Sequence, residues 1–213
     1  YNESDSLYFE EITEESIFEI NEIEECNSVI VSMGGQGPNR LARRLSEQGV
    51  NILGHSSFTI DQAENRETFS SLLDRLDIRQ PRWTVGYSKD QITSFINTVG
   101  YPILVRPSYV LSGASMKVAT SSSELDSALK TAQEVSETYP VVISEFIEDA
   151  MEVEVDGVSS QGVLKYSVIG QHLEKAGVHS GDATIVIPPL TLSARTIDKL
   201  KEAIAKISQN LGL

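Results

Sequence analysis

The sequence predicts an α/β unit followed by a mixed α+β region. Over the first 58 residues, short apolar runs alternate with helical patterns, which is the order typical of a parallel sheet. Later strands alternate apolar and acidic residues, as in 153–158, which favours half-exposed antiparallel pairing. A chain of 213 residues can bury a core without disulfides. We therefore expect two regions, with a boundary between Ile60 and Gln80.

The first region contains three apolar runs that we expect to be strands, at 7–9, 28–33 and 50–54. Thr13 can cap a helix between the first two runs, because a threonine hydroxyl accepts a hydrogen bond from the first helical turn. A loop at Gly34–Pro38 then leads into a second helix that ends at Gly49. The pattern predicts a parallel sheet.

The second region begins with a helical pattern over 59–77, which ends before Pro81. The expected strands are 83–85, 103–105, 116–119, 141–143, 153–158 and 163–169. The expected helices are 89–99, 123–135 and a final amphipathic helix with Ile197 and Leu211 facing inward. In that last helix, Glu202 and Lys206 have the spacing of a surface ion pair.

Composition excludes several partners. The chain has 31 acidic and 17 basic residues, a net charge of −14, and no Lys or Arg before Arg40. This charge argues against nucleic acid or an anionic membrane as the main partner. The single Cys26 excludes an intrachain disulfide and a cysteine-rich metal site. No run approaches the length of a membrane span, and the start does not resemble a signal peptide.

The segment around Arg106 has the residues of a phosphate-binding site. It ends an apolar strand on an arginine, whose planar fork of donors suits phosphate oxygens. The small residues Ser112–Ser115 follow, and they can bring backbone N–H groups close to an anion. No Gly-Lys-Ser/Thr follows, so this is not a Walker loop.

Two further segments each allow a functional and a structural interpretation. Glu145–Glu148, followed by Glu152, could form a hinge that meets a purine and its ribose, although spacing alone favours a solvated strand face. The turn Ala176–Asp182 places a histidine and a serine between glycines. It could face a phosphate or be a tight surface turn, and the two interpretations are balanced.

Other candidates carry weaker signals. Gly34–Pro38 lies between a strand and a helix, where α/β folds bind ligands, but a structural loop explains it at least as well. We expect His172 to lie at a strand end as a structural hydrogen-bond partner. The three histidines and Cys26 do not have the spacing of zinc ligands. His179 and Ser180 are neighbours in the sequence, which is not the pattern of a catalytic triad.

Four segments, in order along the chain, resemble one family: Met33–Pro38, Ile60–Arg66, Arg106–Leu111 and Glu174–Asp182. They are similar to the large synthetase component of carbamoyl phosphate synthetase, and in particular to its second, carbamate-phosphorylating half. The Tyr-Val-Leu after Arg106-Pro107-Ser108 and the run Ala176–Asp182 distinguish that half from the first. The resemblance covers essentially the whole chain.

The resemblance implies a partial pre-ATP-grasp, Rossmann-like unit at 1–58 and a truncated ATP-grasp fold at 59–213, with two subdomains and the start of a third. It implies phosphate-side roles for Arg66 and Arg106, adenine contacts at the hinge for Glu145 and Ile147, and a ribose contact for Glu152. The loop beside the nucleotide would contain Gly177, Val178, His179 and Ser180.

The implied activity is ATP-dependent phosphorylation of carbamate to carbamoyl phosphate, for pyrimidine or arginine synthesis. The implied cofactors are ATP and Mg²⁺ or Mn²⁺, with metal ligands outside these residues, so we assign no catalytic or metal-binding residue here. The implied partners are carbamate, the rest of the synthetase chain and a glutamine amidotransferase subunit or domain. We expect a cytoplasmic location, with a mitochondrial one as the alternative, and no activity from this fragment alone.

Three departures from the family pattern matter. Ser112 stands where a second glycine is common, and Gln171-His172 replaces a Glu-His pair, which removes a carboxylate near the nucleotide loop. Glu145 stands at a variable position, which favours a backbone role there. Two alternatives remain: another ATP-grasp carboxylate ligase, or a non-catalytic nucleotide-binding or assembly module.

Overall fold

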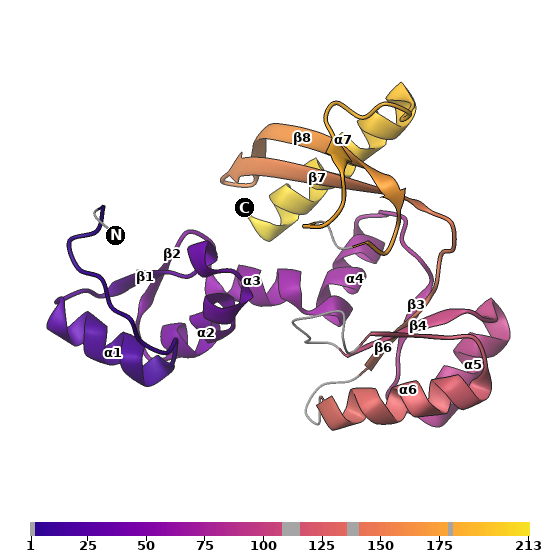
Figure 1. The fold of residues 1–213 in the computed structure, drawn as a ribbon, viewed down its shortest axis with the longest axis horizontal. Coiled ribbons are helices and arrows are strands. Elements are labelled where there is room, and N and C mark those ends of the chain that lie inside the picture. The colour runs from indigo at the N-terminus through magenta and orange to yellow at the C-terminus, as the bar shows by residue number, and fades with distance from the viewer. Residues whose placement is uncertain (1–2, 108–115, 136–140, 179–180) are drawn as a thin grey trace. The chain divides into compact units, whose positions relative to one another are not determined.

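The computed structural model describes residues 3–107, 116–135, 141–178 and 181–213, without the side chains of 133–135. The chain divides into two compact units, Tyr1–Gln62 and Ala63–Leu213. Figure 1 shows one parallel pair of strands in the first unit and two separate sheets in the second. The predicted class, α/β followed by α+β, is confirmed.

The first unit is a two-stranded parallel sheet flanked by helices. Its elements are α1 (Glu14–Ile23), β1 (Ser28–Ile30), η1 (Ser32–Gly34), α2 (Gln36–Glu47) and β2 (Asn51–Leu53). Val29 pairs with Ile52 in parallel register, as the alternating pattern predicts. Thr13 caps α1, because its hydroxyl accepts a hydrogen bond from the Ser16 N–H at 3.2 Å.

Three local expectations for this unit are wrong. Residues 7–9 form no strand, and Phe9 is 78% exposed, so the apolar run has no sheet to join. The strand that begins at Ser28 ends at Ile30, because the chain turns into η1. Helix α2 already begins at Gln36. A Cβ on Gly34 would lie 2.4 Å from Cγ of Pro38, so this glycine is required by close packing of the turn.

The first sheet of the second unit is antiparallel, with strand order β3-β6-β4-β5. Its strands are β3 (Trp83–Val85), β4 (Ile103–Pro107), β5 (Lys117–Ala119) and β6 (Val141–Glu145). Helices α5 (Lys89–Val99) and α6 (Ser122–Val135) cover one face of this sheet (Figure 1). Ile103, Val105 and Ile143 are fully buried between sheet and helices, which makes this the hydrophobic core.

The helical pattern over 59–77 is broken into α3 (Ser57–Glu64) and α4 (Arg66–Arg75). Asn65 has extended backbone angles, and its Oδ1 accepts a hydrogen bond from the Thr68 N–H at 3.0 Å. An asparagine in this role begins a new helix, so the single predicted helix is wrong. The break makes Arg66 the first residue of α4.

The second sheet of this unit contains β7 (Met151–Ser160), β8 (Val163–Lys175) and β9 (Ile185–Val186), all antiparallel. Helix α7 (Ala194–Leu211) packs against β7 and β8, with Ile204 opposite Gly157. Its predicted ion pair is confirmed, since Nζ of Lys206 lies 2.8 Å from Oε1 of Glu202. Strand β8 extends six residues past the expected end at Ile169, which places His172 inside the strand. β9 had no clear signal in the sequence.

Candidate nucleotide site

Two arginines from different elements approach each other in the second unit. Arg106 lies in β4, and Arg66 is the first residue of α4. The Arg106 Nη2 donates to Oγ of Ser144 in β6 at 3.4 Å, whereas its buried Nε has no hydrogen-bond partner in the part of the chain that the structure describes. The Arg66 Nη2 lies 3.9 Å from Sδ of Met116. Neither contact neutralises a guanidinium charge.

The electrostatics of this pair favour an anion. Burial lowers the pKa of Arg106, and the charge of Arg66 lowers it further. Burial also lowers the pKa of Arg66, while Glu64 opposes that change. Both guanidinium groups remain charged at neutral pH, because the ordinary arginine pKa lies far above neutrality. Two half-buried cations with an unused donor fit a polyanion such as a phosphate chain.

The two hinge candidates lie at the end of β6. The Glu145 N–H donates to the Arg82 carbonyl at 2.8 Å, and the Glu145 carboxylate pairs with the Arg82 guanidinium at 3.2 Å. Ile147 lies just beyond the strand and is 51% exposed. The side chain of Glu145 is therefore occupied by Arg82, and Ile147 presents a free apolar surface.

Glu152 and Gly177 are brought together although they lie 25 residues apart. The Gly177 N–H donates to the Glu152 carboxylate at 3.1 Å, at a point where the β7–β8 register shifts between Met151 and Val153. The Ala176 N–H also donates to the Ala150 carbonyl at 3.0 Å. Gly177 has a φ of +107°, which an L side chain rarely adopts. This turn is therefore closed by its own hydrogen bonds.

The remaining predicted residues are partly outside the described chain. Val178 is 38% exposed at the end of this turn. His179, Ser180 and the loop Ser112–Ser115 lie outside the described residues. The structure thus brings Arg66 toward Arg106 and Glu152 toward Gly177 as two separate pairs.

The Gln171 amide holds the segment before α7. Its Oε1 accepts hydrogen bonds from the N–H groups of Leu190 and Thr191, both at 3.0 Å, and its Nε2 donates to the Thr191 hydroxyl at 3.0 Å. Both the oxygen and the nitrogen of this amide therefore have partners in that segment. The expectation that Gln171 removes a carboxylate near the nucleotide turn stays a prediction.

His172 is a buried residue of β8 with 2% exposure, so its expected place at a strand end is also wrong. Neither ring nitrogen has a hydrogen-bond partner among the described residues. Its Nε2 lies 3.5 Å from the Glu154 carboxylate on β7. The ring thus packs across the two strands next to Glu154, instead of acting as the expected hydrogen-bond partner.

No group of three or more His, Cys, Asp or Glu side chains in the described part of the chain could hold a metal ion. Sequence reasoning missed Ser144 and Arg82. A serine inside the apolar run of β6 is a weak signal for the first, and the second has no local signal because its partner is 63 residues away.

The fold is of the ATP-grasp class. A crystal structure of the biotin carboxylase domain of Hydrogenobacter thermophilus 2-oxoglutarate carboxylase, in complex with MgADP, covers 93% of this chain with a TM-score of 0.71. The chain covers 45% of that structure at 14% identity, so this likeness shows the fold alone.

Family models place the chain within this class. The carbamoyl-phosphate synthase L chain, ATP binding domain, matches residues 65–213, and the carbamoyl phosphate synthase preATP-grasp domain matches residues 1–62. The chain therefore belongs to the carbamoyl phosphate synthase large-chain family.

Two relatives illustrate the range of that family. The multifunctional protein URA2 of Saccharomyces cerevisiae is 50% identical over 213 residues, which is all of this chain and 10% of that protein. The mitochondrial arginine-specific carbamoyl phosphate synthase large chain of Neurospora crassa is 46% identical over 210 residues, 98% of this chain and 18% of that protein. The chain thus spans a tenth to a fifth of these relatives. No helix among the described residues is long and apolar enough to cross a membrane.

Proposed function

We propose that this chain binds the ATP that a carbamoyl phosphate synthetase uses to phosphorylate carbamate. The observation that carries the proposal is the half-buried pair Arg66 and Arg106, with a buried Arg106 Nε that has no hydrogen-bond partner among the described residues. Phosphoryl transfer depends on charge neutralisation and positioning more than on a covalent protein group. Two fixed cations supply part of that neutralisation.

The other candidate residues take the remaining parts of the nucleotide. Arg66 and Arg106 hold the phosphate chain, the backbone at Glu145 and Ile147 meets the adenine, and the Glu152 carboxylate accepts from the ribose hydroxyls. Gly177, Val178, His179 and Ser180 line the turn beside the nucleotide. Glu152 already accepts one hydrogen bond from Gly177, which leaves carboxylate lone pairs for a ribose.

In the same proposal, this chain is part of a longer synthetase. Residues 1–58 form the later part of a pre-ATP-grasp domain, and 59–213 form two ATP-grasp subdomains and the start of a third. Mg²⁺ or Mn²⁺ is held by residues outside this chain, and a glutamine amidotransferase subunit or domain supplies nitrogen. The parent enzyme serves pyrimidine or arginine synthesis in the cytoplasm or the mitochondrion.

Calorimetry of Mg-ATP binding tests the proposal. The chain as given should bind Mg-ATP, and Arg106→Ala should lose that binding, because a charged hydrogen bond and a buried cation are removed together. Arg75→Ala is the matched control, since Arg75 is an exposed arginine in the last turn of α4. Equal affinity of Arg106→Ala and Arg75→Ala would exclude the phosphate role.

A second candidate function is nucleotide binding without turnover. The measurement that can exclude it is phosphoryl transfer to carbamate by the chain at saturating Mg-ATP. Turnover would exclude this module, whereas binding without product formation fits both candidates, because we expect no activity from this chain alone.

A further inference from the structure

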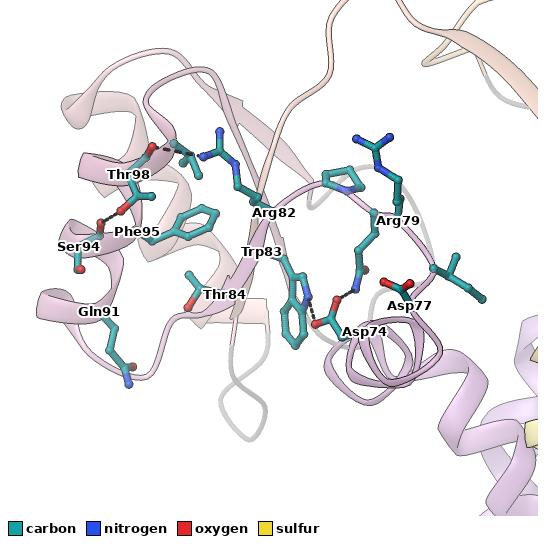
Figure 2. A pocket seen from close by; sticks show the side chains of 14 residues that line it. Asp74, Asp77, Arg79, Arg82, Trp83, Thr84, Gln91, Ser94, Phe95 and Thr98 are labelled. Atoms are coloured by element: carbon teal, nitrogen blue, oxygen red, sulfur yellow. Dashed lines mark hydrogen bonds between the residues drawn. The ribbon is translucent and has the colours of Figure 1, made fainter. Parts of the chain in front are cut away.

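An open pocket of about 750 Å³ lies beside the first residues of β3. Figure 2 shows Asp74 at the end of α4 facing Trp83, with the Arg82 side chain directed toward Thr98. The Asp74 carboxylate accepts from Nε1 of Trp83 at 3.0 Å and from Nε2 of Gln80 at 2.7 Å. These bonds fix the segment that enters β3, and Arg82 is part of that segment.

Arg82 holds Glu145 through side chain and backbone together. Its Nε lies 3.2 Å from Oε2 of Glu145, and its Nη2 lies 3.2 Å from Oε1, which is a two-pronged arginine–carboxylate pair. The two backbones are also joined, because the Glu145 N–H donates to the Arg82 carbonyl at 2.8 Å. A further bond from Nη1 of Arg82 reaches the Thr98 carbonyl of α5 at 3.4 Å. The guanidinium therefore connects β3, β6 and α5.

The chain that leaves β6 is tied on both sides. On one side lies Arg82, and on the other the Phe146 N–H donates to the Pro102 carbonyl at 3.2 Å. Ile147 then leaves the sheet with 51% exposure. The direction in which the segment 146–147 leaves the sheet is thus set by the residue that Arg82 holds.

The Glu145 carboxylate is directed toward Arg82 in this arrangement, and each of its oxygens accepts from the guanidinium. Its pKa lies below the ordinary glutamate value, chiefly because Arg82 donates to it, so the group is charged at neutral pH. The pKa of Arg82 is raised for the same reason. We therefore expect contact with a base at this hinge from the backbone, and not from this carboxylate.

We propose that Arg82 is a positioning residue that fixes the hinge segment 146–147 through Glu145, so that backbone groups and not the Glu145 carboxylate meet the nucleotide base. This inference rests on the proposed ATP site for its ligand. The contact between Arg82 and Glu145 does not depend on that site, so an experiment can contradict the proposed ATP site without contradicting the positioning role of Arg82, and the reverse.

Amide hydrogen exchange measured by NMR on the chain without ligand tests the positioning step. Arg82→Ala and Glu145→Ala should each speed exchange of the Phe146 amide by about three- to fivefold, the range of an exposed ion pair. The double variant should exchange no faster than either single one, because both remove one interaction. Arg79→Ala is the matched control, since it removes an arginine from the same pocket. The charge swap Arg82→Glu with Glu145→Arg should restore slow exchange.

Mg-ATP affinity of the same variants supplies the second readout. We expect the Mg-ATP affinity to fall three- to fivefold in both Arg82→Ala and Glu145→Ala. The affinity should recover in the charge swap and should not change in Arg79→Ala. Unchanged exchange in Arg82→Ala overturns the inference, and so does faster exchange with unchanged ATP affinity. If the native chain does not bind ATP but Arg82→Ala speeds exchange, the positioning step stands and the proposed function fails.

Discussion

The two residue pairs of the candidate site differ in how far their polar groups are satisfied. Arg66 and Arg106 are half-buried cations whose charges repel, and the buried Nε of Arg106 has no hydrogen-bond partner within the described ranges. Glu152 and Gly177 already share a hydrogen bond at 3.1 Å, and the neighbouring Ala176 N–H is also bonded. The arginine end of the site therefore has unsatisfied polar groups without a ligand. At the other end, the turn beside Glu152 satisfies its polar groups with its own hydrogen bonds.

The difference shows where each end obtains its affinity. Burying an uncompensated charge lowers the stability of the free protein, and an anion that relieves it binds more tightly for the same reason. A turn that is already closed costs little to keep in place, so it contributes geometry more than energy. We therefore expect substitutions at the two ends to move stability and ligand affinity in different ways.

The largest expected effect comes from removing the arginine charge without leaving a hole. Arg106→Met should weaken Mg-ATP binding by at least about tenfold and raise the free energy of unfolding of the free chain by about 1 kcal/mol, because the unpaired buried charge is gone. Calorimetry and chemical denaturation of the same sample measure both. Arg75→Met, on the exposed end of α4, should change neither. A fall in both stability and affinity would show that Arg106 is a structural residue.

A smaller effect is expected at the closed end. Glu152→Gln keeps an oxygen that can accept a hydrogen bond from the Gly177 N–H. The substitution removes the negative charge, which strengthens both this hydrogen bond and a hydrogen bond to a ribose hydroxyl. We expect about a fivefold loss of ATP affinity, with the free energy of unfolding lowered by less than about 1 kcal/mol. Titration calorimetry against the native chain gives the ratio. A loss as large as that of Arg106→Met would contradict the proposed division between the two ends.

Local signals predicted the elements that support both ends. Helix α5 spans 89–99 as predicted, since Ser88 caps its start and Gly100, with a φ of +78°, ends it. Where a residue's role depends on a distant partner, prediction failed. Gln171 bonds to the segment 19 and 20 residues later, and no pattern around it shows this.

The same limit applies to the site itself. Arg66 and Arg106 were identified through family motifs, whereas their proximity depends on the break at Asn65 that starts α4. An asparagine within a long helical pattern is a cap only if the chain turns there, and tertiary packing decides that. The Arg82–Glu145 pair joins the residue just before β3 to the last residue of β6, so only the sheet order reveals it.

The smallest expected effect concerns acid pH, and it separates the two ends again. Glu174 lies next to the closed turn, and its pKa is lowered chiefly because the Thr184 N–H donates to its carboxylate at 2.8 Å. A carboxyl whose pKa is lowered in the folded state binds fewer protons than in the unfolded state, so it stabilises the fold above the unfolded pKa of about 4.3. That contribution is lost as the pH falls through the folded pKa.

The arginine pair does not titrate in this range, so only the closed end should weaken. Thermal unfolding between pH 7 and pH 3 should show a smaller acid-induced drop in Tm for Glu174→Gln than for the native chain, by less than about 2 °C. Glu10→Gln, at an exposed position of the first unit, is the control and should follow the native curve. An identical curve for Glu174→Gln would mean that the bond to Thr184 adds nothing to folding, and that the turn beside Glu152 is held by its other hydrogen bonds.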